Sequence, residues 1–406
     1  MDGRSFAMTD AWETLRGRGI NPETFRERLR DFKVETPSWG YGNAGTRFQV
    51  FPQPGAARDI WEKLEDAALV HQLTGACPSV AIHIPWDKVD DYGALKRRAE
   101  SLGLKVGAVN PNLFQDHEYM LGSLCHADAS IRRRARNHLL ECVQIAKEVN
   151  SSMISLWLSD GTNFPGQGNF RKRREWLIEA LEETYAAMPE GMRLLIEYKP
   201  FEPAFYHTDV ADWGSAYALA MRLGPRAQVL VDLGHHLHGA NIEHIVATLI
   251  FEGRLGGFHF NDRKYADDDL ITGSSNPYQL FLIFNELVDA LEDDDPSISD
   301  HASRIGYMID QSHNIEPKIP AMIRSVINIQ TALAKALLVD RVALARAQAD
   351  GDVLGAESIL RDAFETDVRP LLAKFRVEEG LPEDPIAAYY SGGYHEKIVS
   401  TRNVSK

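Results

Sequence analysis

Short apolar runs recur along the chain, and a longer stretch with helical spacing of apolar and polar residues follows each of them. A short apolar run without strict alternation is typical of a strand that is buried on both faces of a sheet. Eight such runs predict strands at residues 32–36, 79–84, 104–109, 153–158, 194–198, 229–233, 257–260 and 306–310. The stretches between them predict helices at residues 59–74, 91–102, 129–149, 170–188, 208–223, 241–253 and 278–292, with a long one from about residue 317.

Eight strands that alternate with eight helices are the elements of a (β/α)8 TIM barrel. A doubly wound open sheet is the structural alternative, but it usually has fewer strands. An N-terminal helix is predicted at residues 22–31, where Asn21 suits the N-cap and Pro22 suits the first helical position. We therefore expect a barrel catalytic domain over residues 1–340. A C-terminal helical extension and tail over residues 341–406 is expected to make oligomer contacts or to cover the chain's own barrel wall.

Composition narrows the classes of protein. The 406 residues include 44 Lys and Arg against 58 Asp and Glu, which gives a formal net charge of −14. Such an acidic surface repels phosphate backbones and anionic lipid, so we expect neither nucleic acid nor a membrane as partner. The chain has no run of roughly 18 apolar residues, no apolar signal core at its start, and three cysteines, too few for a disulfide framework. We expect a reduced, cytoplasmic protein.

Ionisable residues gather where the predicted strands end, and this end of a barrel carries the active site. The residues, in chain order, are His83, Glu197, Lys199, Asp232, His235, His259, Asp267, Asp269 and Asp310. Taken singly, each of them is more simply explained as a polar residue of the core whose hydrogen bonds are satisfied. Carboxylates from four successive strands, however, are costly to bury together unless cations lie nearby.

Charge counting predicts two divalent metal ions at this end of the barrel. Five carboxylates contribute −5 and Lys199 returns +1, so two divalent ions bring the site to neutrality. Spacing predicts that Glu197, Asp232, His259 and Asp310 hold one ion, and that Asp232, His235, Asp267 and Asp269 hold the other. Oxygen ligands with imidazole favour Mn²⁺, with Mg²⁺, Co²⁺ or Zn²⁺ as alternatives. Taken alone, the acidic loop at residues 267–269 would be a solvated loop.

Seven segments carry a family resemblance. They are VETPSWG (34–40), HIPWDK (83–88), LWLSDGTNFPGQ (156–167), IEYKPFEPAFYHTD (196–209), VDLGHH (231–236), FHFNDRKYADDDL (258–270) and MIDQSH (308–313). In this order they resemble L-rhamnose isomerase of the broad-specificity bacterial type, which belongs to the xylose-isomerase-like barrels. The resemblance implies a homotetrameric aldose–ketose isomerase with two Mn²⁺-like ions. The implied substrate is a monosaccharide, with L-rhamnose leading and D-allose, L-mannose and L-lyxose as alternatives.

The same resemblance implies roles for individual residues. Lys199 matches a lysine that contacts a substrate oxygen, and His83 matches a histidine that helps to bind or open the sugar ring. Trp39, Trp157 and Phe48 match an apolar wall, with Phe48 in a segment that in relatives reaches a neighbouring subunit's site. Lys199, His83 and Asp269 are the expected catalytic residues. The alternative for Lys199 is a salt bridge to Glu197.

Two rival functions belong to other classes. A metal-dependent hydrolase or endonuclease on the same barrel is opposed by the net charge of −14 and by the lack of a basic loop with interleaved aromatic residues. A non-catalytic sugar-binding barrel is opposed by the cost of burying five carboxylates for no chemical purpose.

Overall fold

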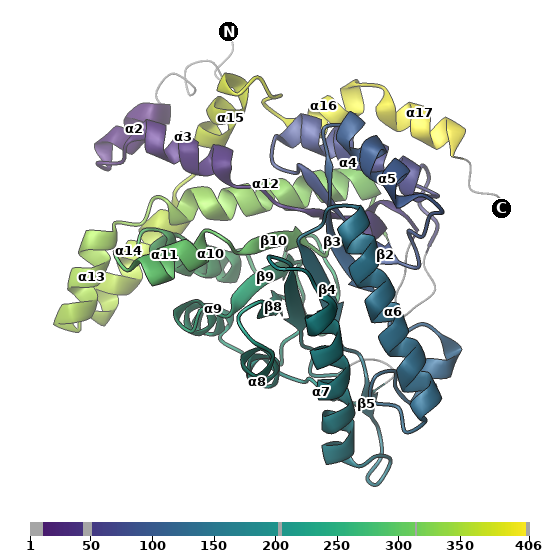
Figure 1. The fold of residues 1–406 in the computed structure, drawn as a ribbon. Coiled ribbons are helices and arrows are strands. Elements are labelled where there is room, and N and C mark those ends of the chain that lie inside the picture. Colours follow the sequence, from purple (N-terminus) through teal and green to yellow (C-terminus); the bar gives the residue numbers. More distant parts are fainter. Residues whose placement is uncertain (1–10, 44–50, 202–204, 313–314, 403–406) are drawn as a thin grey trace.

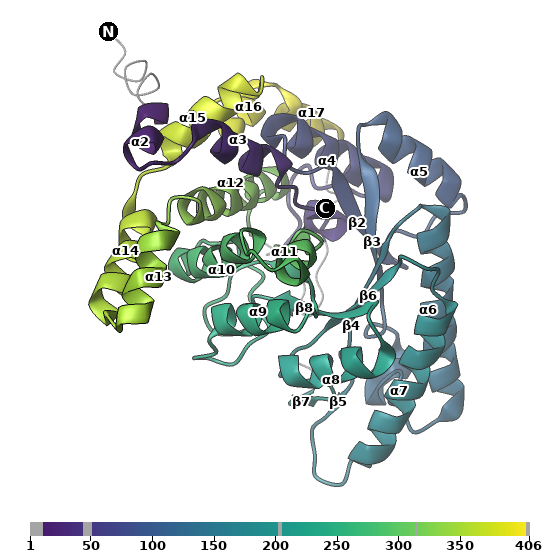
Figure 2. The same ribbon diagram turned by 60° about the vertical axis from the view of Figure 1, so that its left-hand side comes forward.

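The structure is a computed structural model that describes residues 11–43, 51–201, 205–312 and 315–402. A sheet of eight parallel strands lies at its centre, and helices surround it (Figures 1 and 2). In sheet order the strands are β1 (Thr36–Pro37), β2 (Ser79–Ile84), β3 (Lys105–Pro111), β4 (Met153–Trp157), β6 (Arg193–Glu197), β8 (Ala227–Asp232), β9 (Leu255–Phe260) and β10 (Gly306–Ile309). Two further strands, β5 (Gly161–Thr162) and β7 (His207–Thr208), form a separate antiparallel pair.

The sheet closes on itself through its first and last strands. Glu35, just before β1, forms a parallel bridge with Met308 of β10. The Glu35 N–H donates to the Tyr307 carbonyl at 2.8 Å, and the Ile309 N–H donates to the Glu35 carbonyl at 2.9 Å. Because β1 also pairs with β2, the ring of strands is complete and the predicted TIM barrel is confirmed.

Helices follow the strands around the outside of the barrel. They are α4 (Ile60–Thr74), α5 (Tyr92–Ser101), α6 (Ala129–Glu148), α7 (Phe170–Ala187), α8 (Trp213–Leu223), α9 (Ile242–Phe251), α10 (Pro277–Leu291), α11 (Pro296–Ala302) and α12 (Lys318–Ala336). Helices α2 (Ala11–Gly17) and α3 (Pro22–Asp31) precede the barrel, and short 3-10 helices lie at Ser38–Tyr41 and His117–Leu121. The predicted cap of α3 is present, because the Asn21 side chain accepts a hydrogen bond from the Glu23 N–H at 2.9 Å.

Most element boundaries differ from the prediction by at most about two residues, and two differ by more. The first strand was expected at residues 32–36, but the ladder with β2 covers Thr36–Pro37. The Glu35 side chain turns into the barrel, where its Oε1 accepts a hydrogen bond from the Ala108 N–H at 2.9 Å. Helix α8 begins at Trp213 and not at residue 208, because Asp212 caps it and residues 207–208 pair with β5.

The apolar core has two parts, as the geometry of a barrel requires. The larger part fills the space between the sheet and the helices. The smaller part lies inside the barrel and consists of Trp39, Ala81, Ala108, Leu195, Leu230 and Met308. Small residues inside leave room for the Glu35 carboxylate, since a Cβ at Gly107 would lie 1.3 Å from Glu35 Oε2.

The C-terminal extension packs on the chain's own barrel wall. It comprises α13 (Arg341–Asp350), α14 (Val353–Glu365), α15 (Arg369–Glu378), α16 (Pro385–Ser391) and α17 (Tyr394–Thr401). Helices α15 to α17 run back with α2 and α3 as an outer layer over α12 and α4 (Figure 2). Buried Asp66 of α4 anchors this layer, since its carboxylate binds Arg402 Nη1 at 2.7 Å and the Tyr394 hydroxyl at 2.8 Å.

Among the described residues, no single helix is long and apolar enough to cross a membrane. Helices α12 and α13 reach that threshold only as a pair, and they are bent by 64° at the break between them.

We predict that Arg402→Met destabilises the fold by about 3 kcal/mol, because it leaves the buried Asp66 carboxylate without its cation. The measurement is calorimetric unfolding. Arg369→Met is the matched control, since Arg369 pairs with Asp367 at an exposed site and its loss should leave Tm unchanged. Equal Tm values for the two variants would contradict the anchoring role of Arg402.

Candidate active site

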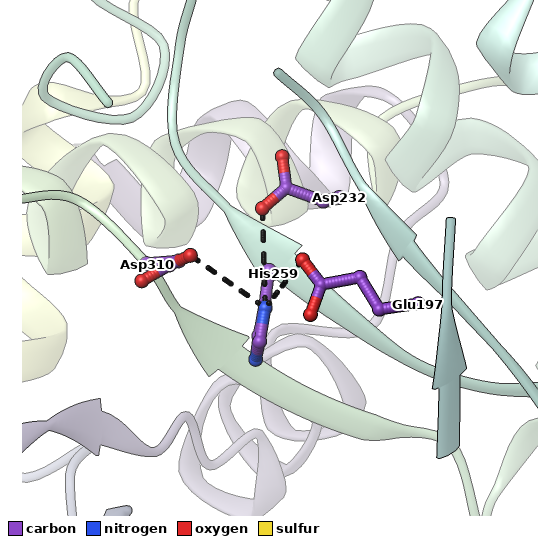
Figure 3. Close-up of side chains that lie close together, drawn as sticks. All are labelled: Glu197, Asp232, His259 and Asp310. Carbon is purple, nitrogen blue, oxygen red and sulfur yellow. Dashed lines mark ion pairs between the residues drawn. The ribbon is translucent and has the colours of Figure 1, made fainter. Parts of the chain in front are cut away.

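The C-terminal ends of four neighbouring strands bring three carboxylates and one imidazole together. Glu197 ends β6, Asp232 ends β8, His259 lies on β9 and Asp310 follows β10. The four side chains offer one ligand atom each within 4.8 Å of one another. Figure 3 shows the carboxylates pointing at His259 Nδ1, which lies 3.3 Å from Glu197 Oε1, 3.7 Å from Asp310 Oδ2 and 3.9 Å from Asp232 Oδ2.

A second group shares Asp232 with the first. Asp232, His235 and Asp267 also offer ligand atoms within 4.8 Å of one another. His235 Nε2 lies 3.2 Å from Asp267 Oδ2, whereas its Nδ1 lies 3.1 Å from the Tyr198 carbonyl oxygen. A carbonyl only accepts, so Nδ1 carries a proton. Burial acts to lower the pKa of His235, but the carboxylates of Asp232 and Asp267 raise it well above its usual value, so Nε2 donates to Asp267. With Nδ1 on the carbonyl, Nε2 is the ring atom that would bind a metal ion in place of that proton. This arrangement is typical of a histidine that binds a metal ion.

The electrostatics of the first group fit a cation. Burial raises the pKa of Asp310 to about 7, even though His259 and the Trp39 N–H at 2.7 Å oppose the shift. Burial also raises the pKa of Asp232. For His259, burial acts to lower the pKa, but the neighbouring carboxylates, Glu197 foremost, raise it to about 9. Burial also acts to raise the pKa of Glu197, but His259 and His235 bring it below its usual value. Asp310 and Asp232 are therefore the two carboxylates whose ionised form a divalent ion would stabilise.

The Asp232 carboxylate is held in place by its own neighbours. Its Oδ1 accepts hydrogen bonds from the Gly234 N–H at 2.6 Å and from Asn261 Nδ2 at 3.0 Å. Gly234 is needed there, because a Cβ would lie 2.6 Å from Asp267 Oδ1 and 3.2 Å from Asp232 Oδ1. The role of Gly234 was not predicted from the sequence, since it depends on the Asp267 side chain of a different loop.

The acidic loop is ordered by backbone pairing and not simply solvated. Asp262 and Leu270 form an antiparallel bridge at its base, and Asp268 Oδ2 accepts a hydrogen bond from the Lys264 N–H at 2.7 Å. The loop places Asp267 in the second group. Asp269 lines the same cavity, with a left-handed φ of 48°, but it lies outside both groups of ligand atoms.

Lys199 is buried beside the second group. Its Nζ donates to Asp267 Oδ2 at 2.6 Å and lies 4.8 Å from the centre of the Trp157 ring. The ion pair is therefore made with Asp267 and not with Glu197, which was the alternative considered from the sequence. Strand β7 fixes the backbone of Lys199, since the Thr208 hydroxyl donates to its carbonyl.

Aromatic side chains form one wall of the cavity. The His83 ring stacks on Trp86 at 3.9 Å between centroids, and the rings of Trp39 and Phe114 meet it edge-on at 5.5 Å and 5.7 Å. Trp157 continues the wall, 4.5 Å from Phe114. Trp39 and Trp157 were expected in this wall.

Several cavity residues were not predicted from the sequence, and one predicted residue lies outside the described structure. Phe114, Asn110 and Ser155 line the cavity. Of these, Phe114 follows the third strand directly, so its position was the available signal. Phe48, also expected in the wall, falls outside the described residues.

A third group of potential ligands is already satisfied by protein contacts. Cys125, Asp160 and Asp209 lie within 4.8 Å of one another. Asp160 accepts hydrogen bonds from the Ser123 and Cys125 N–H groups, both at 2.7 Å, and Arg173 Nη2 binds Asp209 Oδ2 at 2.6 Å. The group ties together the loops after β3, β4 and β7 and needs no ion.

Comparison with known proteins identifies the family. Residues 73–294 match the family described as xylose isomerase-like TIM barrel, and the chain belongs to this family. A probable sugar isomerase of Rhizobium meliloti (strain 1021) is 48% identical over 98% of this chain and 94% of its own length. A probable sugar isomerase of Mesorhizobium japonicum is 47% identical over 96% of this chain and 90% of its own length.

More distant proteins share the fold. The D-allulose 3-epimerase of a Methylomonas species superposes with a TM-score of 0.56 at 12% identity, covering 74% of this chain and 98% of that one. An L-ribulose 3-epimerase superposes with a TM-score of 0.51 at 16% identity, covering 82% of this chain and 97% of that one. At such low identity these structures establish the barrel and nothing finer.

We predict that Gly234→Ala weakens Mn²⁺ binding by about tenfold, because the added methyl group displaces Asp267 from its place beside Asp232. Titration calorimetry with Mn²⁺ measures the effect. Gly17→Ala is the control, since a Cβ at Gly17 meets nothing within 4 Å. Wild-type affinity in Gly234→Ala would show that the position of Asp267 is unimportant for the metal.

Proposed function

We propose that this protein is a metal-dependent aldose–ketose isomerase that interconverts L-rhamnose and L-rhamnulose. Related pairs such as D-allose and D-psicose, and the sugars L-mannose and L-lyxose, are further candidate substrates. The observation that carries the proposal is the pair of ligand groups that share Asp232 beside an aromatic wall. The two relatives near half identity, both described as probable sugar isomerases, support it.

Two divalent ions, Mn²⁺ in the first instance, fit the donor set. Glu197, Asp232, His259 and Asp310 would hold one ion, and Asp232, His235 and Asp267 would hold the other. Asp269 lines the same cavity and would join the second set as a further protein ligand, although its atoms lie outside both groups of ligand atoms. When bound, such ions polarise neighbouring sugar oxygens and ease the loss of a hydroxyl proton. The raised pKa of Asp310 supports this assignment, because the carboxylate lacks positive charge to offset its burial.

His83 is suited to contact a sugar hydroxyl. Burial lowers the pKa of His83 to about 3, so its ring is neutral at pH 7 and offers one donor and one acceptor. Its Nδ1 is buried and has no hydrogen-bond partner among the described residues. Stacking on Trp86 fixes the plane of the ring. We assign His83 to binding the sugar ring and to the proton transfer that opens it.

Lys199 supplies the positive charge on the other side of the cavity. Its ammonium group lies between Asp267 and the face of Trp157. From there it can donate a hydrogen bond to a sugar oxygen that gains negative charge during isomerisation. Asp269 lines the cavity and completes the acidic set. The indoles of Trp39 and Trp157 would face the C–H side of the sugar. The family resemblance adds Phe48 to the apolar wall, a residue that lies outside the described residues.

We predict ketose formation from L-rhamnose with Mn²⁺, its loss on exhaustive chelation, and its return when Mn²⁺ is added back. A panel of L-rhamnose, D-allose, L-mannose and L-lyxose ranks the substrates. Reaction in ²H₂O distinguishes the two routes for hydrogen transfer, since an enediol takes up solvent deuterium and a hydride shift does not. Full activity after verified removal of metal would overturn the proposal, and metal-dependent cleavage of a phosphodiester would favour a hydrolase.

We further propose a cytoplasmic homotetramer, as the family resemblance implies. Large apolar side chains are exposed on loops that follow the strands around the mouth of the barrel, and such patches mark contacts between proteins. These side chains are Phe51, Phe164, Tyr206, Leu237 and Tyr265, together with Phe170 at the start of α7. The three cysteines are buried and unpaired, which agrees with a reducing compartment.

We predict that light scattering coupled to gel filtration measures the mass of four chains. Tyr206→Glu with Phe164→Glu should lower that mass, because charges replace apolar contacts around the mouth. The control is Val353→Glu with Leu354→Glu, which changes equally exposed apolar residues on α14. A monomeric wild-type protein would refute the tetramer.

A further inference from the structure

A buried ion pair lies behind the aromatic wall. Lys63 Nζ of α4 donates to Asp87 Oδ1 at 2.6 Å, and the two side chains are 9% and 0% exposed. Lys63 comes from α4, a helix of the barrel wall, whereas Asp87 follows β2 at the mouth of the barrel. The pair therefore connects α4 to the loop that follows β2, the strand that carries His83.

The second oxygen of Asp87 holds two segments of the cavity wall. Asp87 Oδ2 accepts a hydrogen bond from the His83 N–H at 2.8 Å and another from the Ser38 hydroxyl. The Asp87 N–H in turn donates to the His83 carbonyl at 2.8 Å. Ser38 directly precedes Trp39, whose indole N–H binds Asp310 at 2.7 Å. The Asp87 carboxylate thus binds both the backbone N–H of His83 and the side chain of Ser38, the residue before Trp39. It links the two chain segments that carry these aromatic groups of the cavity.

Stability alone does not explain this pair. A buried ion pair loses the solvation of both charges, and well-packed apolar residues of similar volume are often as stable. What an apolar pair would not supply is the fixed acceptor for His83 and Ser38. The T-shaped contact of Trp39 with His83, at 5.5 Å between centroids, depends on the relative position of these two segments.

Helix α4 also provides an internal comparison. Asp66, one turn after Lys63, forms a second buried ion pair with Arg402 on the side of α4 that faces the C-terminal tail. Its partners are Arg402, Tyr394 and, through Arg402, the Gly55 carbonyl. The two pairs resemble each other in burial and chemistry, but the contacts of Asp87 lead to the cavity and those of Asp66 lead away from it.

We propose that Asp87, held by Lys63, is a positioning residue that sets the relative position of Trp39 and His83 in the aromatic wall of the sugar site. The inference rests on the proposed isomerase function only for its kinetic consequence. Asp87 touches no part of the cavity and acts through the backbone of His83 and the hydroxyl of Ser38. A sugar that contacts this wall binds more weakly when Trp39 and His83 shift relative to each other.

The test compares Asp87→Asn with Asp66→Asn, two changes that each remove one buried charge on either side of α4. Asp87→Asn should raise KM for the sugar by about tenfold, since reacting groups displaced by less than 1 Å have effects of this size. Asp66→Asn should lower Tm but leave KM within about twofold, because its contacts do not reach the site. Ser38→Ala, which removes only a hydroxyl group, should shift KM in the same direction as Asp87→Asn. It provides the same test if Asp87→Asn does not fold.

A readout without catalysis accompanies the kinetics. With 5-fluorotryptophan in place of the seven tryptophans, the ¹⁹F resonance of Trp39 is assigned from Trp39→Phe. It should move or broaden in Asp87→Asn and Ser38→Ala and stay in place in Asp66→Asn. An unmoved resonance together with equal KM values in Asp87→Asn and Asp66→Asn would overturn the positioning role. If the wild type isomerises no sugar, the proposed function fails, and the resonance alone decides the role of Asp87.

Discussion

The burial of carboxylates at one end of a closed parallel barrel is the constraint on which the rest of the structure depends. Asp232 offers a ligand atom within 4.8 Å of one from Glu197 and of one from Asp267. Because Glu197 and Asp232 are buried and Asp267 is half-buried, water cannot solvate these carboxylates fully. Removing such charges from water is costly unless cations or hydrogen-bond donors replace the solvent. His235, His259 and Lys199 supply part of that compensation, and the remaining deficit appears as the raised pKa of Asp310.

The surrounding structure keeps these groups from relaxing apart. Asn261 and the backbone of Gly234 hold Asp232, and the carbonyl of Tyr198 sets the orientation of His235. Behind the aromatic wall, Asp87 and Lys63 hold the backbone of His83. A site with preorganised groups pays little reorganisation energy when a ligand binds, and this is the common property of these contacts.

Much of the fold follows from patterns that are local in the sequence. The strand at residues 79–84 and the helix cap at Asn21 were predicted closely, because apolar period and capping chemistry act over a few residues. The first strand was predicted several residues too early, since the path of Glu35 depends on a space above Gly107 in another strand. Strand β7 was missed because its two residues pair only with β5.

The sequence by itself determined which residues stand at the strand ends, and hence that Glu197, Asp232, His259 and Asp310 would meet. This is so because parallel strands with a period of two place their last residues at one end of the barrel. Only the tertiary structure decided that Lys199 pairs with Asp267, that Phe114 joins the wall and that Lys63 reaches Asp87. Each of these contacts joins loops or helices whose relative positions are set by packing, and packing leaves no local pattern in the sequence.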